Sequence, residues 1–560
     1  MKDISQNTRL IIACIISTVI IAVWQYLFVE PMIETQQQDN STITQTITPV
    51  EVHKFIARSE AIAKTDRIAF ENKVVKGSVN LVGARFDDLI LKKYHVGLDA
   101  MSPQVELLNP LGTTASNFIE FGWVRGGDET IELPTIKTKW QVYKSGDLSK
   151  EKPLVLVWKN SSGQEFYLSA TLDENYMFSI SQKMVNNGKE VALAPYSLVS
   201  KNHTSTEPKN MIIHEGGIAV AQDKLDEVDL ETLKEDGKAE VKSNVSWMGF
   251  SDKYWLSAII PADKNSKLEF KYVENKEGID RFQANLLAPL VTVNGGGVFE
   301  SSYHLFVGAK ELDLLDKYEQ DMKIKLFDRA VDFGVLYFIT KPIFMMLHYF
   351  YDYLGNFGVA ILMLTVLIKL ILFPLAHKGF VGMNKMKDLQ PKMAQLKERY
   401  AEDASGFQKA LLELYKKEKV NPMAGCLPIL LQIPVFFALY KVLYVTIEMR
   451  HAPFFGWIKD LSVPDPTSIF NLFGLIPWDP PSFLMVGVFP ILMALTMYFQ
   501  QRLNPEPTDP VQAQVMRLLP LIFLFMFASF PSGLVIYWAW SNVLSILQQL
   551  LIKRMVKVGK

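Results

Sequence analysis

The sequence predicts a mixed membrane protein in which six α-helical spans carry a large antiparallel β-sandwich domain outside the membrane. Apolar residues gather at the N-terminus and in the last 210 positions, although the apolar fraction of the 560-residue chain is an ordinary 49%. Residues 55–325 instead contain short β-branched and aromatic segments broken by Gly, Asn and Asp. Positive charge is divided unevenly between the connections of the later apolar segments, which indicates a fixed orientation.

The first apolar segment is LIIACIISTVIIAVWQYLF at 10–28. Its 19 residues would rise roughly 28 Å as a helix, about the thickness of one hydrocarbon core. Trp24, Tyr26 and Phe28 follow at its end, as is typical of a membrane interface. The alternative, a cleaved signal peptide, has a shorter apolar core and a small-residue cleavage site. We expect residues 1–30 to be a cytoplasmic tip and uncleaved signal anchor, followed by a flexible Gln- and Thr-rich linker at 31–54.

The region 55–325 reads as a many-stranded domain large enough to bury its own core. Segments such as KPLVLVWKN (152–160), EFYLSATL (165–172) and LVTVNGGGVFESSYHLFVG (290–308) have strand composition. No catalytic or metal-binding spacing is evident in this domain, because His95, His203 and His214 are scattered. The glycines at 295–297 predict a turn or bulge, and Asp87–Asp88 predict solvated loop charges.

Residues 326–356 join this domain to the next span. Apolar residues recur at helical spacing over 327–339, with Asp328, Arg329 and Asp332 on the other side. Two interpretations stay open: an amphipathic helix in the membrane interface, or the last helix of the external domain. Pro342 is then expected to begin an aromatic helix that leads into the membrane.

The later spans are expected at 357–375, 427–447, 483–500, 511–530 and 532–552. The fifth span overall is weak, because its apolar core, Leu518–Phe530, has only 13 residues. The segment 376–426 carries ten Lys and Arg residues, whereas the loop 448–482 carries two. With the basic tail at 553–560, the positive-inside rule makes 376–426 and both termini cytoplasmic and the β domain external.

The cytoplasmic segment 376–426 has its own helical pattern. Apolar residues repeat at +3 and +4 over 386–400 and again over 407–414, which predicts two helices of about four turns or less, paired as an antiparallel hairpin. Pro391 either begins or kinks the first helix. A charged helix pair is often simply solvated; between membrane spans, it is also a plausible docking arm for a partner. The candidate docking cations are Lys385, Lys392, Lys397, Arg399, Lys416 and Lys417.

Lys369 stands in the apolar run LMLTVLIKLILFPL at 362–375. A charge inside a span usually faces a protein interior or water, and the alternative is that the lysine stem extends to the cytoplasmic rim. Thr365 shares its helix face, and further polar or aromatic side chains lie in the other spans. Together they predict a polar, wet cavity in the inner leaflet. Its candidate residues are Lys369, Thr365, Gln432, Trp538, Asn542, Thr496 and Gln500, with Ser541 beside them.

The composition excludes several kinds of chemistry. The spans contain no histidine, no carboxylate and no nucleophile–base pair, which argues against proton-coupled transport and intramembrane hydrolysis. The two cysteines, Cys14 and Cys426, define no disulfide framework or zinc spacing. A net charge of −1 does not favour binding to nucleic acid. From these three observations we expect no enzyme activity, no cofactor, no metal and no specific nucleic acid.

Three segments carry a resemblance: KVNPMAGCLPILLQIPVFFALYKVL (419–443), FPLA…LQPKM (373–393) and FPSGLVIYWAWSN (530–542). With the layout of one anchor, an external β domain and five further spans, the sequence resembles the YidC family of membrane protein insertases. The resemblance implies a Gram-negative inner membrane, a periplasmic β-supersandwich and a cytoplasm-facing hydrophilic groove. Lys369 matches the central groove position, usually arginine in the family, and Trp538 matches the aromatic position. Thr365 and Gln432 match the neighbouring polar positions.

The resemblance also implies partners: nascent membrane proteins, membrane lipid, the Sec translocon with its accessory subunits, the ribosome and the signal recognition pathway. Two other functions are distinguishable by sequence. A small-solute transporter or channel with a periplasmic binding domain predicts paired intramembrane charges or inverted repeats. A tethered carbohydrate-binding or carbohydrate-converting enzyme predicts an acid/base pair within 55–320. The sequence displays neither pattern.

Overall fold

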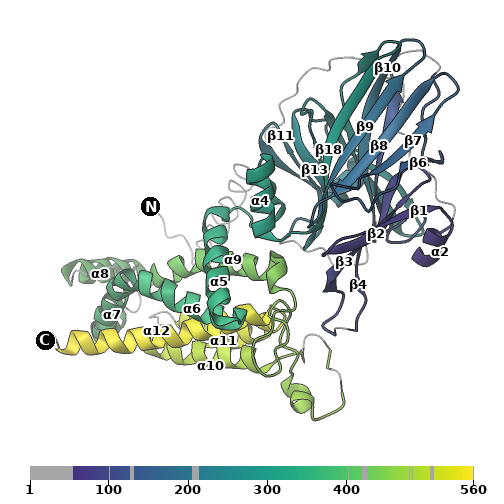
Figure 1. The fold of residues 1–560 in the computed structure, drawn as a ribbon. Coiled ribbons are helices and arrows are strands. Elements are labelled where there is room, and N and C mark those ends of the chain that lie inside the picture. The colour runs from purple at the N-terminus through teal and green to yellow at the C-terminus, as the bar shows by residue number, and fades with distance from the viewer. Residues whose placement is uncertain are drawn as a thin grey trace. The chain divides into compact units, whose positions relative to one another are not determined.

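The computed structural model describes residues 54–99, 101–126, 131–204, 213–400, 403–418, 420, 427–478, 480–481, 484–504 and 510–558. Its N-terminal part is a β-sandwich and its C-terminal part is helical (Figure 1). The anchor expected at 10–28 lies outside the described residues, as do the linker up to residue 53 and both cysteines.

Two antiparallel nine-stranded sheets form the β domain. One has the order β1-β2-β3-β5-β10-β16-β15, with β4 on β3 and β17 on β10; the other runs β12-β11-β13-β14-β18-β9-β8-β7-β6. The strands of the first sheet are β1 (Arg67–Glu71), β2 (Val75–Asn80), β3 (Arg85–His95), β4 (Gln104–Leu108), β5 (Asn117–Arg125), β10 (Val191–Thr204), β15 (Lys267–Lys276), β16 (Ile279–Leu287) and β17 (Val291–Val293). Those of the second are β6 (Gln141–Lys144), β7 (Leu154–Lys159), β8 (Gln164–Leu172), β9 (Met177–Asn186), β11 (Gly216–Ala221), β12 (Lys224–Asp229), β13 (Val245–Ser251), β14 (Trp255–Pro261) and β18 (Val298–Ala309).

Alternating side chains build the core between the two sheets. In β8 every second residue is buried, as a strand with one face on the core requires. Aromatic rings join the sheets: Phe86 of β3 lies 5.7 Å from Phe178 of β9. Three helices, α2 (Arg58–Ala63), α3 (Leu230–Asp236) and α4 (Leu312–Met322), accompany the strands. The expected antiparallel sandwich is confirmed, and residues 294–297 form the expected turn, with Gly296 at φ +80°.

The interpretation of Asp87 and Asp88 as solvated loop charges is wrong. Both lie on β3, 1% and 8% exposed. Asp87 pairs with Arg67 of β1, and Asp88 pairs with Arg58 of α2. Buried carboxylates are stable when paired and hydrogen-bonded in this way. The partners stand 20 and 30 residues away in sequence, so local composition did not reveal them.

Lys310, directly after β18, is 1% exposed and donates to Ser251 Oγ at 3.1 Å. Burial lowers the pKa of this ammonium to about 8. Because the unfolded chain then holds the proton more tightly, Lys310 destabilises the fold below pH 8, by at most about 3 kcal/mol. This destabilisation disappears as the pH rises to about 10.4.

We expect Lys310→Met to raise the unfolding temperature of the β domain at pH 7, and the difference in unfolding temperature from the unmodified chain to shrink by pH 10. A difference independent of pH, measured by thermal unfolding, would contradict this.

The C-terminal part contains eight described α-helices: α5 (Tyr337–Leu354), α6 (Phe357–Ile371), α7 (Phe373–Arg399), α8 (Ala404–Lys417), α9 (Leu427–Val445), α10 (Val488–Leu503), α11 (Pro510–Ala528) and α12 (Ser532–Val558). Short 3₁₀ segments are η1 (Phe327–Ala330), η3 (Ile447–Met449) and η4 (Ile469–Gly474). Of the described helices, α12 over Ser532–Met555 is long and apolar enough to cross a bilayer alone. The bent pair α6–α7 passes the same test together, and Gln432–Val445 and Ala513–Ala528 are shorter apolar segments.

The amphipathic helix expected at 327–339 does not form, under either interpretation. Residues 327–330 make only a 3₁₀ turn, and α5 begins at Tyr337, so Pro342 lies inside it and does not start it. Phe327 packs 5.5 Å from Trp247 and 5.4 Å from Phe306 of the β domain. Helical spacing was present, but burial of these side chains against the sheet outweighs a short helix of marginal stability.

The hairpin differs in length from the expectation. A 67° bend separates α6 from α7, where Pro374 lacks the N–H that would continue the first helix. From there α7 runs 27 residues, through Pro391, and is therefore much longer than four turns. The expected seam is present: Leu389 and Met393 of α7 pack with Leu411, Leu414 and Tyr415 of α8.

Candidate functional site

Lys369 lies in the last turn of α6, and its ammonium turns toward two other helices. Nζ donates to Ser545 Oγ of α12 at 2.8 Å and to Gln432 Oε1 of α9 at 3.3 Å. The side chain is half-buried. Both hydrogen bonds turn the ammonium toward α9 and α12, and Lys369 stands two residues before the end of α6.

Further contacts hold the residues around this ammonium. Gln432 Nε2 donates to Tyr537 OH of α12, which fixes the amide so that its oxygen faces Lys369. The backbone carbonyl of Lys369 accepts from Gln548 Nε2 at 3.1 Å. Since α6 ends at Ile371, its last carbonyls lack partners within the helix, and Gln548 supplies one of them. We call Lys369, Gln432, Ser545, Tyr537 and Gln548 the lysine cluster.

The electrostatics of the lysine cluster are unusual. None of α6, α9, α10, α11 and α12 contains an Asp or Glu within its bounds, and among the described residues no carboxylate lies within 4.0 Å of Nζ. Neutral oxygens satisfy two donors of an ammonium that has three. Within the described part of the chain neutral dipoles hold this charge, and such an ammonium in an apolar helical region can attract an anionic group that arrives from outside.

The other candidate residues occupy different places. Thr365 is buried and donates to its own helix, at Ile361 O, so it is not in the lysine cluster. Asn542 Nδ2 donates to Thr496 Oγ1 at 3.2 Å, which joins α12 to α10. Gln500 is half-buried, one turn beyond Thr496. The structure thus places the seven candidates in separate groups.

Trp538 belongs to an aromatic group. Its ring centroid lies 4.8 Å from that of Phe436 of α9, 4.9 Å from Phe527 and 6.1 Å from Phe523 of α11. Trp538 thus faces apolar rings, while its neighbour Tyr537 accepts the Gln432 amide within the lysine cluster. An apolar aromatic surface and a polar cluster thus adjoin on one helix.

Sequence reasoning missed Tyr537, Ser545 and Gln548. A signal was available: residues 537, 541, 545 and 548 recur at spacings of four and three along α12, which is one helix face. Small hydroxyls inside apolar helices are common, however, so the pattern alone did not single out Ser545 as a partner of Lys369.

The six candidate docking cations all lie on exposed parts of the hairpin. Lys392 of α7 pairs with Glu418, just after α8, at 2.6 Å. This ion pair contributes to holding the two helices together, whereas Lys385, Arg399, Lys416 and Lys417 add positive charge to the exposed surface.

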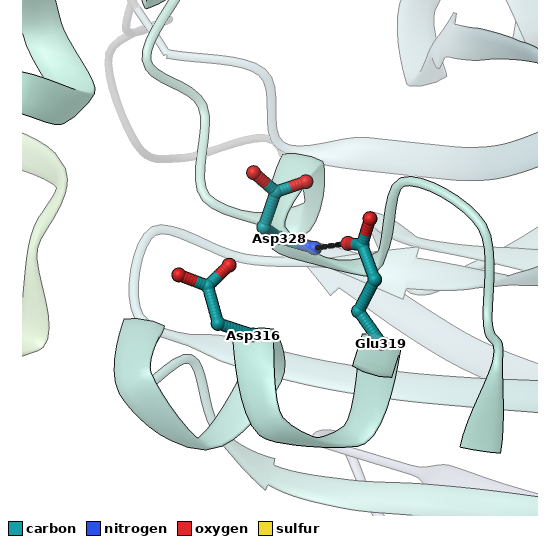
Figure 2. Close-up of side chains that lie close together, drawn as sticks. All are labelled: Asp316, Glu319 and Asp328. Atoms are coloured by element: carbon teal, nitrogen blue, oxygen red, sulfur yellow. Dashed lines mark hydrogen bonds between the residues drawn. The ribbon is translucent and has the colours of Figure 1, made fainter. Parts of the chain in front are cut away.

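A second group of charges lies near the start of α5. Ligand oxygens of Asp316, Glu319 and Asp328 all lie within 4.8 Å of one another (Figure 2). Lys341 Nζ contacts Asp316 Oδ1 at 2.7 Å and Asp328 Oδ2 at 2.8 Å, and Glu319 accepts the N–H of Asp328. The ammonium of Lys341 pairs with two of the three carboxylates, and the ion pair between Asp316 and Lys341 ties α4 to α5.

Fold and site together define an integral membrane protein in which a helical region with an internal ammonium is joined to a β-sandwich. The family model described as "60Kd inner membrane protein" matches residues 349–559, and "YidC periplasmic domain" matches 67–346. Proteins named membrane protein insertase YidC from Rickettsia rickettsii (strain Sheila Smith) and Rickettsia felis are 50% and 49% identical, covering 98% of this chain and 99% of theirs. The chain belongs to the YidC family of membrane protein insertases, which are non-enzymatic inner membrane proteins with a periplasmic β-sandwich domain.

Two solved structures also match parts of the chain, at lower identity. An active YidC insertase structure with its first transmembrane domain resolved is 18% identical over 86% of this chain and 91% of that chain, with a TM-score of 0.35. A putative mutarotase from Salmonella typhimurium is 10% identical over 44% of this chain and 92% of that chain, with a TM-score of 0.29.

Proposed function

We propose that this chain inserts and helps to fold inner-membrane proteins through a hydrophilic groove, open to the cytoplasm, whose fixed charge is Lys369. The observation that carries the proposal is the ammonium of Lys369, whose partners among the described residues are the neutral oxygens of Gln432 and Ser545. Thr365, Thr496, Gln500, Asn542 and Trp538 are proposed to complete the groove wall.

The proposed topology has six spans, with both termini in the cytoplasm and the β domain in the periplasm. The basic helix α7 directly follows the last turn of α6, which carries Lys369. By the positive-inside rule this end of α6 is cytoplasmic, and the groove then opens to that side. The proposed segments are 1–30 (tip and anchor), 31–54 (linker), 55–325 (β domain), 326–356 (lead-in), 357–375 (second span), 376–426 (hairpin), 427–552 (third to sixth spans) and 553–560 (tail).

A substrate segment enters from the cytoplasm or from the lipid, and its short polar flank, often acidic, is drawn to Lys369. The flank then crosses part of the membrane beside water and dipoles instead of lipid, which lowers the barrier that a charge meets in hydrocarbon. The apolar part of the substrate leaves past α9 and α11, where Phe436, Phe523 and Phe527 surround Trp538. Partitioning into lipid, at ~25 cal/mol per Å² of apolar surface, supplies the driving force without a nucleotide or covalent step.

The partners proposed for this activity are nascent membrane proteins and membrane lipid, with the Sec translocon, its accessory subunits, the ribosome and the signal recognition pathway. The exposed basic surface of the α7–α8 hairpin supports a cytoplasmic docking role, because nascent chains arrive with a polyanionic ribosome. A proton-coupled transporter finds less support, since α6, α9, α10, α11 and α12 carry no acidic residue.

Photo-crosslinking to a stalled nascent membrane protein tests the groove. We expect crosslinks from probes at positions 432, 545 and 538, because the first two border the ammonium and the third borders the proposed exit. A probe at Ser161, in the exposed β7–β8 turn, is the matched negative control. The groove would be contradicted if the probe at 161 crosslinked as strongly as those at 432 and 545. It would also be contradicted if no probe gave a crosslink.

A further inference from the structure

The connection between α9 and α10 has an apolar tip. Residues 466–478, PTSIFNLFGLIPW, contain no charged side chain. Leu475 is 83% exposed, and Leu472 and Phe473 are just over half exposed. Phe470, Ile476 and Trp478 are also exposed. We call residues 466–478 the loop tip.

Two acids near the loop tip are buried, while its apolar side chains are exposed. Asp465, at the base of the loop tip, is 3% exposed. Its Oδ1 accepts Trp457 Nε1–H at 3.1 Å and the Thr467 N–H at 3.0 Å, and its Oδ2 accepts the Phe489 N–H at 3.0 Å, at the start of α10. Asp460 is also buried and accepts from Ser462. Asp460 and Asp465 are hydrogen-bonded inside while the apolar side chains of the loop tip face outward, an arrangement that suits an apolar surrounding.

The loop tip is an ordered turn, so its exposed residues are not simply an unfolded segment. The Phe473 N–H donates to Ser468 O at 2.7 Å, and the Ile476 N–H donates to Asn471 O at 3.1 Å. Leu472 and Phe473 have φ of 49° and 57°, a left-handed conformation that costs roughly 1–2 kcal/mol for each residue with a side chain. The strained backbone therefore lies at Leu472 and Phe473, two of the residues whose apolar side chains are exposed.

We infer that the loop tip inserts into the bilayer leaflet on the side where α9 ends and α10 begins. Both ends of the connection are tied to apolar helices, so the tip starts at the bilayer surface. Trp457, whose indole N–H donates to Asp465 at the base of the loop tip, lies 5.9 Å (ring centroids) from Phe489 of α10, and further along α10 Leu492, Leu495 and Phe499 are exposed. Lipid is the occupant because the apolar helices α9 and α10, to which both ends of the connection are tied, lie in the bilayer.

Insertion of the loop tip would anchor the α9–α10 connection in the membrane in addition to the helices themselves. Asp465 caps the N-terminus of α10 and also receives bonds from the loop, so insertion of the tip fixes the level of that helix end in the bilayer. This inference depends on the positions of α9 and α10 and holds with or without the lysine groove.

A fluorescent probe tests the insertion in the full chain. Leu475→Cys, in a chain with Cys14→Ser and Cys426→Ser, is labelled with an NBD fluorophore and reconstituted in vesicles of phosphatidylcholine. Lipids with a nitroxide at a shallow acyl position should quench this probe about twofold or more, since interfacial segments lie about 5–10 Å below the headgroup boundary. The matched control, Ser161→Cys in the exposed β7–β8 turn, should show no quenching.

Two further measurements vary the charge of the lipid and the polarity of the loop tip. Adding phosphatidylglycerol should leave the quenching unchanged, because the loop tip is uncharged. Phe473→Asp, at an exposed side chain, should reduce the quenching without lowering the unfolding temperature. A probe at 475 that behaves like the one at 161 overturns the inference. Blue-shifted emission without nitroxide quenching also overturns it, since the tip would then lie against protein or a second copy.

Discussion

Lys369→Glu is expected to slow the insertion of substrates with acidic flanks by at least about tenfold, whereas Lys369→Arg retains insertion. The unmodified ammonium attracts the flank, and reversal of the charge turns this attraction into repulsion. Two charges 6 Å apart at an effective dielectric of 20 interact by about 3 kcal/mol, and a tenfold change in rate needs only about 1.4 kcal/mol. The measurement is the initial rate of insertion into proteoliposomes that contain the purified chain.

Substrates provide the internal control for this prediction. A substrate with an uncharged flank should be inserted by Lys369→Glu at nearly the rate of the unmodified chain. Lys150→Glu, at an exposed site in the β domain, is the matched charge reversal and should change neither rate. The unfolding temperature shows whether Lys369→Glu is folded. Equal insertion of acidic-flank substrates by a folded Lys369→Glu chain would remove the electrostatic role of Lys369.

Neutralising the exposed cations of the hairpin is expected to weaken ribosome binding by about tenfold or more. The variant replaces Lys385, Lys397, Arg399, Lys416 and Lys417 with Gln. Cations near nucleic acid contribute through contacts with phosphates and the release of counterions, so losing five of them should also flatten the dependence of affinity on salt. Lys392 is kept because it pairs with Glu418, and the apolar seam at Leu389 and Met393 is untouched.

A matched variant separates this effect from a loss of net charge. It neutralises five exposed lysines of the β domain: Lys137, Lys144, Lys150, Lys152 and Lys264. This variant should bind ribosomes as the unmodified chain does, and both variants should retain the unfolding temperature. If the hairpin variant binds with unchanged affinity and salt dependence, the docking role is wrong.

The spacing of apolar residues along the sequence predicted those elements whose buried face is set by that spacing. Strand alternation predicted the sandwich, and β8 shows it residue by residue. The +3 and +4 spacing predicted the hairpin seam. The same spacing failed at 327–339, because Phe327 is buried against Trp247, a residue 80 positions earlier, and not against its own helix neighbours. Asp87 and Asp88 failed for a related reason, since their arginine partners come from β1 and α2.

At the candidate site, too, the sequence determined some features and the tertiary structure decided others. The sequence by itself determined that an ammonium stands in an apolar helix and that none of the expected spans contains a carboxylate, because residue types and helix length are local properties. Only the tertiary structure decided which groups hold that ammonium. Thr365, one turn away, bonds to its own backbone, whereas Ser545, 176 residues away, receives the Lys369 donor. Helix packing sets such contacts through the rotation and depth of each helix, and these follow from the fit of many side chains that no single segment encodes.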